Sequence, residues 1–162
     1  MVKMVWKNEV IKNLIEENSL LENHSKTLID IAAKDGGVYR SISPEILAID
    51  VDAYNVQHCK GRGTRGRTVD AIVGCQDKGN KLLMVEFRLN YTTFKNLKSE
   101  ELKEKCDGTT SLITSQTMPY HKEVWFVFPE KNFNQYKNWF QRQQNAKAIP
   151  KAFVAKTPKE LC

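Results

Sequence analysis

The most regular pattern of hydrophobic and polar positions runs from Thr68 to Asn90, TVDAIVGCQDKGNKLLMVEFRLN. Its first half is rich in β-branched residues and its second half is almost entirely apolar, and both compositions are typical of strands. The residues between them, QDKGN, include Asp, Gly and Asn, which favour a turn. The pattern therefore predicts a β-hairpin in which Cys75 lies opposite Lys81.

Counting back from this turn places Ala71 opposite Val85 and Asp70 opposite Glu86. Because side chains alternate along a strand, one face of the hairpin is predicted to be wholly apolar. The other face changes from apolar residues near the turn to Asp70, Glu86 and Arg88 at the far end. Two facing carboxylates destabilise a sheet unless a cation lies between them, and the candidates are Arg88 or a divalent metal ion.

Upstream of the hairpin, apolar residues recur at helical spacing from about Val5 to Leu21, which indicates an amphipathic helix. Glu17 lies in line with the apolar stripe. Its carboxylate is expected either to remain in solvent at the flank of the helix or to reach toward the acidic end of the hairpin. Ser25 is expected to cap a second helix over residues 26–34.

The run ILAIDVDAYNV, residues 46–56, alternates between apolar and polar positions, as expected of a half-buried strand. It would be the first strand of the sheet. Asp50 and Asp52 lie on its polar side, where they either face solvent or join the acidic cluster of the hairpin.

Downstream of the hairpin, Thr92 or Thr93 can cap a polar helix that extends through Cys106, unless the helix restarts at Ser99. Its Lys-rich face is expected to be solvated. Further predicted elements are a buried strand at 123–128, a helix at 131–147 and an edge strand at 151–156.

The predicted order is helices, three consecutive strands, helix, strand, helix, strand. This order indicates an α/β protein with a mixed sheet, a three-strand meander plus further strands, flanked by helices. The 162 residues, of which 41% are hydrophobic, suit one domain with one core, so we expect residues 1–162 to fold as a unit.

A net charge of +6 and a pI near 9.1 favour polyanionic partners such as nucleic acid. No apolar run approaches the roughly 20 residues of a membrane span, and the N-terminal residues lack an apolar signal core. The four cysteines are scattered without a metal-binding or redox spacing, which fits a reducing compartment. We therefore expect a cytoplasmic protein that does not enter membranes.

A cationic segment, KGRGTRGR, leads directly into Asp70. It carries Lys60, Arg62, Arg65 and Arg67. Cations beside a metal site can follow a phosphate backbone, because each contact releases counterions from the nucleic acid. The alternative is a solvated turn between two strands.

The order Asp70, hairpin, Glu86, Phe87, Arg88 resembles the core motif of the PD-(D/E)XK nuclease superfamily. Members of that superfamily bind a metal through an Asp at the start of one strand and an acidic residue on the next. In this sequence Arg88 stands at the position of the motif's lysine, and Val69 at that of its proline. The succession of predicted elements resembles the superfamily core over about 120 residues, which implies a restriction-endonuclease-like fold.

The resemblance implies a metal-dependent nuclease, or a nuclease-like nucleic-acid-binding protein, that acts on phosphodiester backbones. Asp70 and Glu86 would hold Mg²⁺, for which Mn²⁺ could substitute, and Arg88 would contact the scissile phosphate. Mg²⁺ suits this role because proteins usually hold it through one or two carboxylates and leave its other positions to water and phosphate. The cationic segment would hold the nucleic-acid backbone.

A second reading remains open, because several branches of the superfamily have lost catalysis and serve as binding proteins. Arg88 can neutralise Asp70 and Glu86 through charge-assisted hydrogen bonds without a metal. The chain would then be a catalytically degenerate nuclease-fold protein that binds another protein, such as the immunity or antitoxin partner of a toxin.

Overall fold

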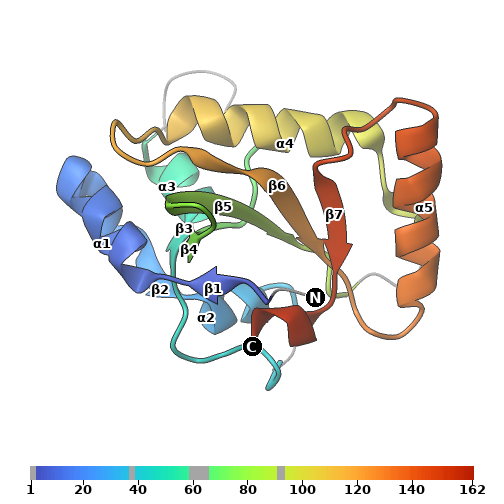
Figure 1. Ribbon diagram of the computed structural model, residues 1–162, viewed down its shortest axis with the longest axis horizontal. Helices are drawn as coiled ribbons and strands as arrows, with labels where there is room; N and C mark the ends of the chain where they lie inside the picture. Colours follow the sequence, from blue (N-terminus) through green and yellow to red (C-terminus); the bar gives the residue numbers. More distant parts are fainter. Residues whose placement is uncertain (1–2, 37–38, 59–65, 91–93) are drawn as a thin grey trace.

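The computed structural model describes residues 3–36, 39–58, 66–90 and 94–162. Across these residues seven strands form one mixed sheet, in which six follow the order β2-β3-β4-β5-β6-β7 and β1 pairs with β4 (Figure 1). The strands are β1 Val5–Trp6, β2 Ser25–Thr27, β3 Leu47–Asp50, β4 Ala71–Gln76, β5 Asn80–Phe87, β6 Tyr120–Val127 and β7 Phe153–Lys156. The helices are α1 Asn8–Glu17, α2 Leu28–Ala33, α3 Val51–His58, α4 Ser99–Leu112 and α5 Phe133–Asn145, with short 3₁₀ turns η1 Ser19–His24, η2 Phe94–Asn96 and η3 Pro158–Leu161.

The strand directions divide the sheet into two parts. Strands β2 to β5 are antiparallel to their neighbours, whereas β5, β6 and β7 run parallel. Parallel neighbours need a crossover connection, and α4 and α5 lie in the two crossovers. The structure therefore confirms the predicted α/β class, with a mixed sheet flanked by helices.

The hairpin β4–β5 has the predicted register, with Ala71 opposite Val85 and Cys75 opposite Lys81. Gln76 also pairs with Asn80, so the turn is shorter than the five residues expected. The turn contains Gly79 at φ 115°, a backbone conformation that glycine adopts without steric strain. Because the two additional residues pair with each other, the shorter turn leaves the register unchanged.

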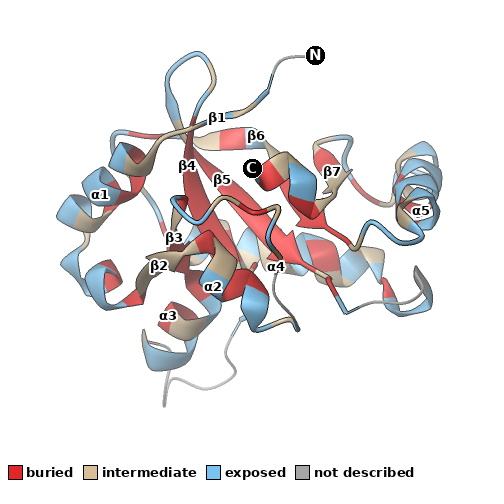
Figure 2. Cartoon of the chain, turned by 90° about the horizontal axis from the view of Figure 1, so that it is seen from below, coloured by how far each residue is buried: buried red, intermediate tan, exposed pale blue. Residues whose placement is uncertain are grey.

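Helices cover both faces of the sheet (Figures 1 and 2). Apolar residues of α1, α4 and α5 pack with Ile72, Leu82 and Met84 on one face. Those of α2 and η3 pack on the other face. There the hairpin contributes six members of the apolar face expected from the sequence, together with Cys75: Ala71, Val73, Leu83, Val85, Phe87 and Leu89. Val69 departs from that set, since it precedes β4 and packs on the side of α1 and α4.

The strand predicted over residues 46–56 is wrong in its second half, because β3 ends at Asp50 and α3 begins at Val51. The Asp50 Oδ1 atom accepts a hydrogen bond from the Ala53 N–H (3.1 Å) and so caps the helix. Asp50 is buried rather than solvated, and Asp52 is exposed on α3.

The N-terminal elements also differ from the prediction. Residues 25–27 form β2 instead of the first turn of a helix, and α2 begins at Leu28. Thr27 rather than Ser25 supplies the cap, since its hydroxyl accepts the Asp30 N–H (3.4 Å). Within the described residues, the helices are too short or too polar to cross a membrane.

The predictions for the second half of the chain hold more closely. The helix after the hairpin begins at Ser99 and continues past Cys106 to Leu112. The two later strands and α5 lie at or within about three residues of the expected positions.

Candidate functional site

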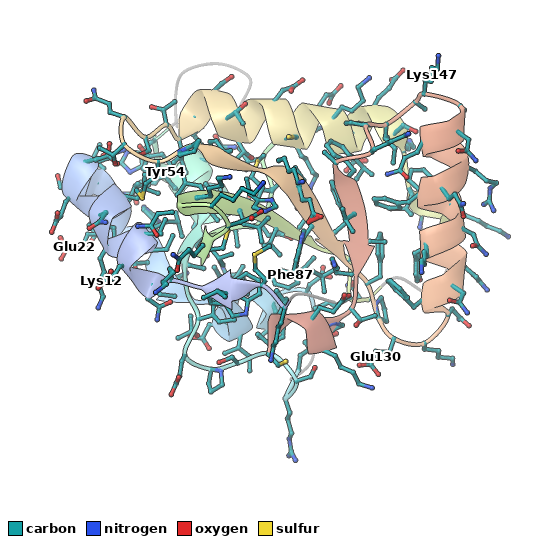
Figure 3. The ribbon with its side chains drawn as sticks, viewed as in Figure 1. Lys12, Glu22, Tyr54, Phe87, Glu130 and Lys147 are labelled. Atoms are coloured by element: carbon teal, nitrogen blue, oxygen red, sulfur yellow. The ribbon has the colours of Figure 1, made fainter. Side chains whose placement is uncertain are left out.

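The structure brings the predicted acidic pair, Asp70 and Glu86, together at the end of the hairpin opposite its turn. Glu86 Oε1 accepts the Asp70 N–H (3.1 Å), and Asp70 Oδ2 accepts the Phe87 N–H (2.7 Å). These bonds continue the pairing of the two segments beyond Ala71 and Val85, where the regular ladder ends. Phe87 lies near the middle of the molecule, whereas Lys12, Glu130 and Lys147 lie at its periphery (Figure 3).

The acidic pair is poorly hydrated. Glu86 is 1% exposed and Asp70 is half-buried. Burial, followed by the negative charge of Glu86, raises the pKa of Asp70 well above its usual value. The pair therefore favours a bound proton or an additional cation over two full negative charges.

Two cations already bind Glu86. Lys105 Nζ lies 2.7 Å and Arg88 Nη2 lies 3.0 Å from the same oxygen, Oε2. Arg88 follows β5, as the sequence indicated, but Lys105 comes from α4, whose Lys-rich face was expected to be solvated. The positive charge of Lys105 opposes the rise in the pKa of Asp70. Lys105 is the site residue that sequence reasoning missed.

Close packing of α4 against the residues before β4 positions Lys105. A Cβ atom on Gly108 would lie 1.9 Å from the Arg67 carbonyl oxygen, so this approach requires glycine. Thr109, one residue later, accepts the Val69 N–H (2.9 Å) through Oγ1 and donates to the Lys105 carbonyl (2.7 Å). Glycine within a helix costs about 1 kcal/mol relative to alanine, and here it permits the contact that sets the position of the helix.

Glu101, one turn before Lys105 on α4, extends the ion-pair network outward. Its Oε1 atom lies 3.4 Å from Arg88 Nη2 and 3.1 Å from Arg67 Nη1. The spacing of Glu101, Lys105 and Thr109 at intervals of four places them on one face of the helix. That spacing is the sequence signal that groups Lys105 with Glu101, but it does not show that this face meets the hairpin.

Arg67 is the one predicted backbone-binding cation that lies within the described part of the chain. Its guanidinium also contacts Glu104, with 3.4 Å between Nε and Oε2. Lys60, Arg62 and Arg65 lie outside the described residues, so their predicted role stays a prediction.

A further carboxylate, Asp35, lies near Arg88 and Lys105. Its Oδ2 atom accepts the Leu89 N–H just beyond β5. Burial raises the pKa of Asp35, while hydrogen bonds and the nearby charges of Arg88 and Lys105 oppose that rise. The cations of the site therefore interact with more than two carboxylates.

The other acidic residues considered from the sequence bind elsewhere. Glu17 accepts hydrogen bonds from Ser115 (2.6 Å) and the Gln116 N–H (2.8 Å), and these lower its pKa. It therefore holds the segment after α4, and the expected reach toward the hairpin is absent from its described contacts. Asp50 pairs with Lys26 and Lys34 rather than with the acidic cluster.

The donor set at the hairpin fits a magnesium ion held by two carboxylates. Among the described residues, no group of three or more His, Cys, Asp or Glu side chains converges as a metal-binding cluster. Mg²⁺ differs from zinc in this respect, because it usually keeps several waters and uses one or two protein carboxylates. Asp70 and Glu86 would supply that number of ligands, and three of their four oxygens already accept hydrogen bonds or ion pairs: Glu86 Oε1, Glu86 Oε2 and Asp70 Oδ2.

A cavity of about 520 Å³ is a separate feature. It lies on the sheet face that carries η3, and Trp125 lines it together with His121, which is paired with Asp77 (2.8 Å). Asp70 and Glu86 are not among its lining residues. The cavity is therefore a site separate from the acidic pair.

The sequence matches no protein-family model, and neither the curated proteins nor the solved structures compared with it give a match.

Proposed function

We propose that this protein is a metal-dependent nuclease, or a nuclease-like protein that binds phosphodiester backbones, with a restriction-endonuclease-like fold. The observation that carries the proposal is the convergence of Asp70 and Glu86 at the end of the hairpin, with Lys105 and Arg88 beside them. Two adjacent carboxylates flanked by cations suit a divalent metal and a phosphate group together.

The order of elements supports the fold part of the proposal. Helix α1 precedes an antiparallel β3–β4–β5 unit, and α4 then crosses to a parallel β6, followed by α5 and β7. This arrangement resembles the PD-(D/E)XK core suggested by the sequence motif. The acidic pair lies on the hairpin positions that the motif assigns to it.

Asp70 and Glu86 would hold the metal ion, which when bound would activate water for attack on a phosphodiester. Lys105 and Arg88 would contribute positive charge beside the reacting phosphate. Arg88 carries a planar guanidinium that stays charged at any accessible pH, whereas Lys105 carries a compact ammonium with three donors. An ammonium group is thus present at the acidic pair even though arginine occupies the lysine position of the motif.

The direct test incubates the purified protein with single-stranded, duplex and branched DNA and RNA, with and without Mg²⁺ or Mn²⁺. We expect metal-dependent cleavage that Asp70→Asn and Glu86→Gln each abolish. Asp107→Asn, an exposed residue on α4, is the matched control and should retain activity. Absence of cleavage on every substrate, together with absence of salt-sensitive binding, would refute the proposal.

A second candidate function follows from the two cations on Glu86 Oε2. Lys105 and Arg88 can neutralise the acidic pair without metal, which fits a degenerate nuclease fold that binds a protein such as a toxin. Metal-dependent thermal stability separates the two functions. If the pair binds metal, Mg²⁺ at about 100 times its Kd should stabilise the fold by about 2.7 kcal/mol, and Asp70→Asn should remove the effect. An unchanged melting temperature in the wild type would favour the degenerate protein.

A further inference from the structure

The guanidinium groups of two arginines contact one carboxylate oxygen of Glu101, next to the acidic pair. Arg67 Nη1 lies 3.1 Å and Arg88 Nη2 lies 3.4 Å from Glu101 Oε1. The three residues come from three elements: the segment before β4, the segment after β5, and α4. Folding of the hairpin against α4 therefore assembles this contact.

The exposure of these side chains differs in a way that matters for binding. The Arg67 side chain is 57% exposed and that of Glu101 is 25% exposed, whereas that of Arg88 is 12% exposed. Arg88 is thus fixed by its surroundings, and the outer two side chains are accessible to solvent. A solute can therefore approach the Arg67 and Glu101 side chains from the solvent.

Phosphate oxygens and carboxylate oxygens are bound by arginine in the same way, through charge-assisted N–H donors. Arg88 Nη2 contacts Glu101 Oε1 and also Glu86 Oε2 (3.0 Å). A phosphate in the place of the Glu101 carboxylate would consequently lie next to the acidic pair. Exposed ion pairs are weak, so displacing Glu101 from Arg67 costs little.

We propose that Arg67 and Arg88 form a phosphate-binding subsite that the Glu101 carboxylate occupies in the free protein. A phosphate of a nucleic-acid backbone binds there by displacing Glu101, which acts as an internal competitor. This inference rests on the proposed function and identifies where its substrate is held.

The test measures the affinity of the full-length protein for a labelled single-stranded DNA and the matching RNA, in EDTA and at low salt. Glu101→Gln removes the competing charge, and we expect it to tighten binding by roughly two- to fivefold, the range for one exposed ion pair at low salt. Glu100→Gln is the matched control, because Glu100 is exposed in the same helical turn and carries the same charge. It should tighten binding clearly less.

Two further variants make the result specific. Glu101→Asp keeps the charge but shortens the side chain, and it should give part of the gain. Adding Arg67→Gln to Glu101→Gln should cancel the gain, because the phosphate then loses one of its two donors. Equal affinities of Glu101→Gln and Glu100→Gln, or a gain that persists without Arg67, would overturn the subsite.

The outcome separates this inference from the proposed function. Metal-dependent cleavage without any effect of Glu101→Gln would leave the nuclease in place and remove the subsite. A gain that depends on Arg67, in a protein that cleaves nothing, would establish the subsite and remove the catalytic claim. Failure of every variant to bind nucleic acid, together with absence of metal-dependent cleavage, would refute both.

Discussion

Two acidic sites within the described residues, one at Asp50 and one at Asp70 and Glu86, differ in the balance of charge. Asp50, 1% exposed, is a single carboxylate with two lysines: Lys26 at 3.0 Å and Lys34, also in contact. It also accepts the Ala53 N–H. Burial alone would raise the pKa of Asp50, but the hydrogen bonds from Lys34, Ala53 and Lys26 together lower it.

At the hairpin the balance is reversed. Lys105 and Arg88 both bind Glu86, beside Asp70, and Arg88 is shared again with Glu101. The pKa of Asp70 is raised there, chiefly by burial and then by Glu86. A carboxylate that is surrounded by more than enough hydrogen-bond donors to balance its charge has a structural role. An added cation would offset the effect that raises the pKa of Asp70, whereas Asp50 already has its cations.

The largest expected effect comes from removing both cations at the hairpin. The double variant Arg88→Ala/Lys105→Ala leaves buried Glu86 facing Asp70 without a cation, and it should lower the free energy of unfolding by about 3–5 kcal/mol. Urea denaturation at neutral pH measures the loss. Each single variant retains one cation on Glu86 Oε2 and should lose clearly less than half of this amount.

Lys103→Ala is the control for this cycle, because Lys103 is exposed on the same helix. It should change the stability little. If the two single losses add up to the double loss, the cations do not substitute for one another at Glu86, and the comparison between the two acidic sites fails.

A smaller loss is expected at the satisfied site. Asp50→Ala removes the α3 cap, which should cost about 2 kcal/mol, and Asp52→Ala on the exposed side of the same helix should cost little. Because the pKa of Asp50 is lowered by folding, its stabilising contribution is present above the unfolded value of about 3.9 and is lost as the pH falls below it. Stability curves of wild type and Asp50→Ala should therefore converge in acid. Parallel curves down to the lowest pH would contradict this account.

The smallest expected effect is a gain. The folded-state pKa of Asp70 lies above its unfolded value, so ionising Asp70 weakens the fold as the pH rises through that folded value. Asp70→Asn cannot ionise, keeps an acceptor for the Phe87 N–H and can donate to Glu86. In the absence of metal its melting temperature should exceed that of the wild type at pH 8, and the difference should shrink toward pH 4.

Differential scanning fluorimetry across this pH range measures the effect, with Asp107→Asn as the exposed control. A melting temperature of Asp70→Asn below that of the wild type at pH 8 would show that the Asp70 charge stabilises the metal-free fold.

The elements that the sequence predicted are those fixed by local patterns. The hairpin register followed from a short turn between two apolar runs, and it held because slipping by one residue would reverse every side chain. The division between β3 and α3 failed because Leu47, Ile49 and Val51 continue the strand alternation up to the point where Asp50 caps a helix. The capping residue is a single position, whereas the alternation extends over several residues, so the sequence pattern favoured a strand where the structure has a helix.

The acidic pair could be predicted because both residues lie on one hairpin. Lys105 could not be assigned in the same way, since its contact with Glu86 depends on how a helix distant in sequence packs on the sheet. The i, i+4 pattern of α4 showed which residues share a face. Only the tertiary structure shows which face meets the hairpin.

The charge balance at the hairpin depends on Gly108, because this residue has no Cβ atom. A methyl group at this position would meet the Arg67 carbonyl and hold α4 away from the strands, and Lys105, one turn earlier, would move away from Glu86 with it. The size of the residue at position 108 therefore sets the distance between helix and sheet. A substitution there would change the affinity of the acidic pair for protons and cations without altering any of its functional groups.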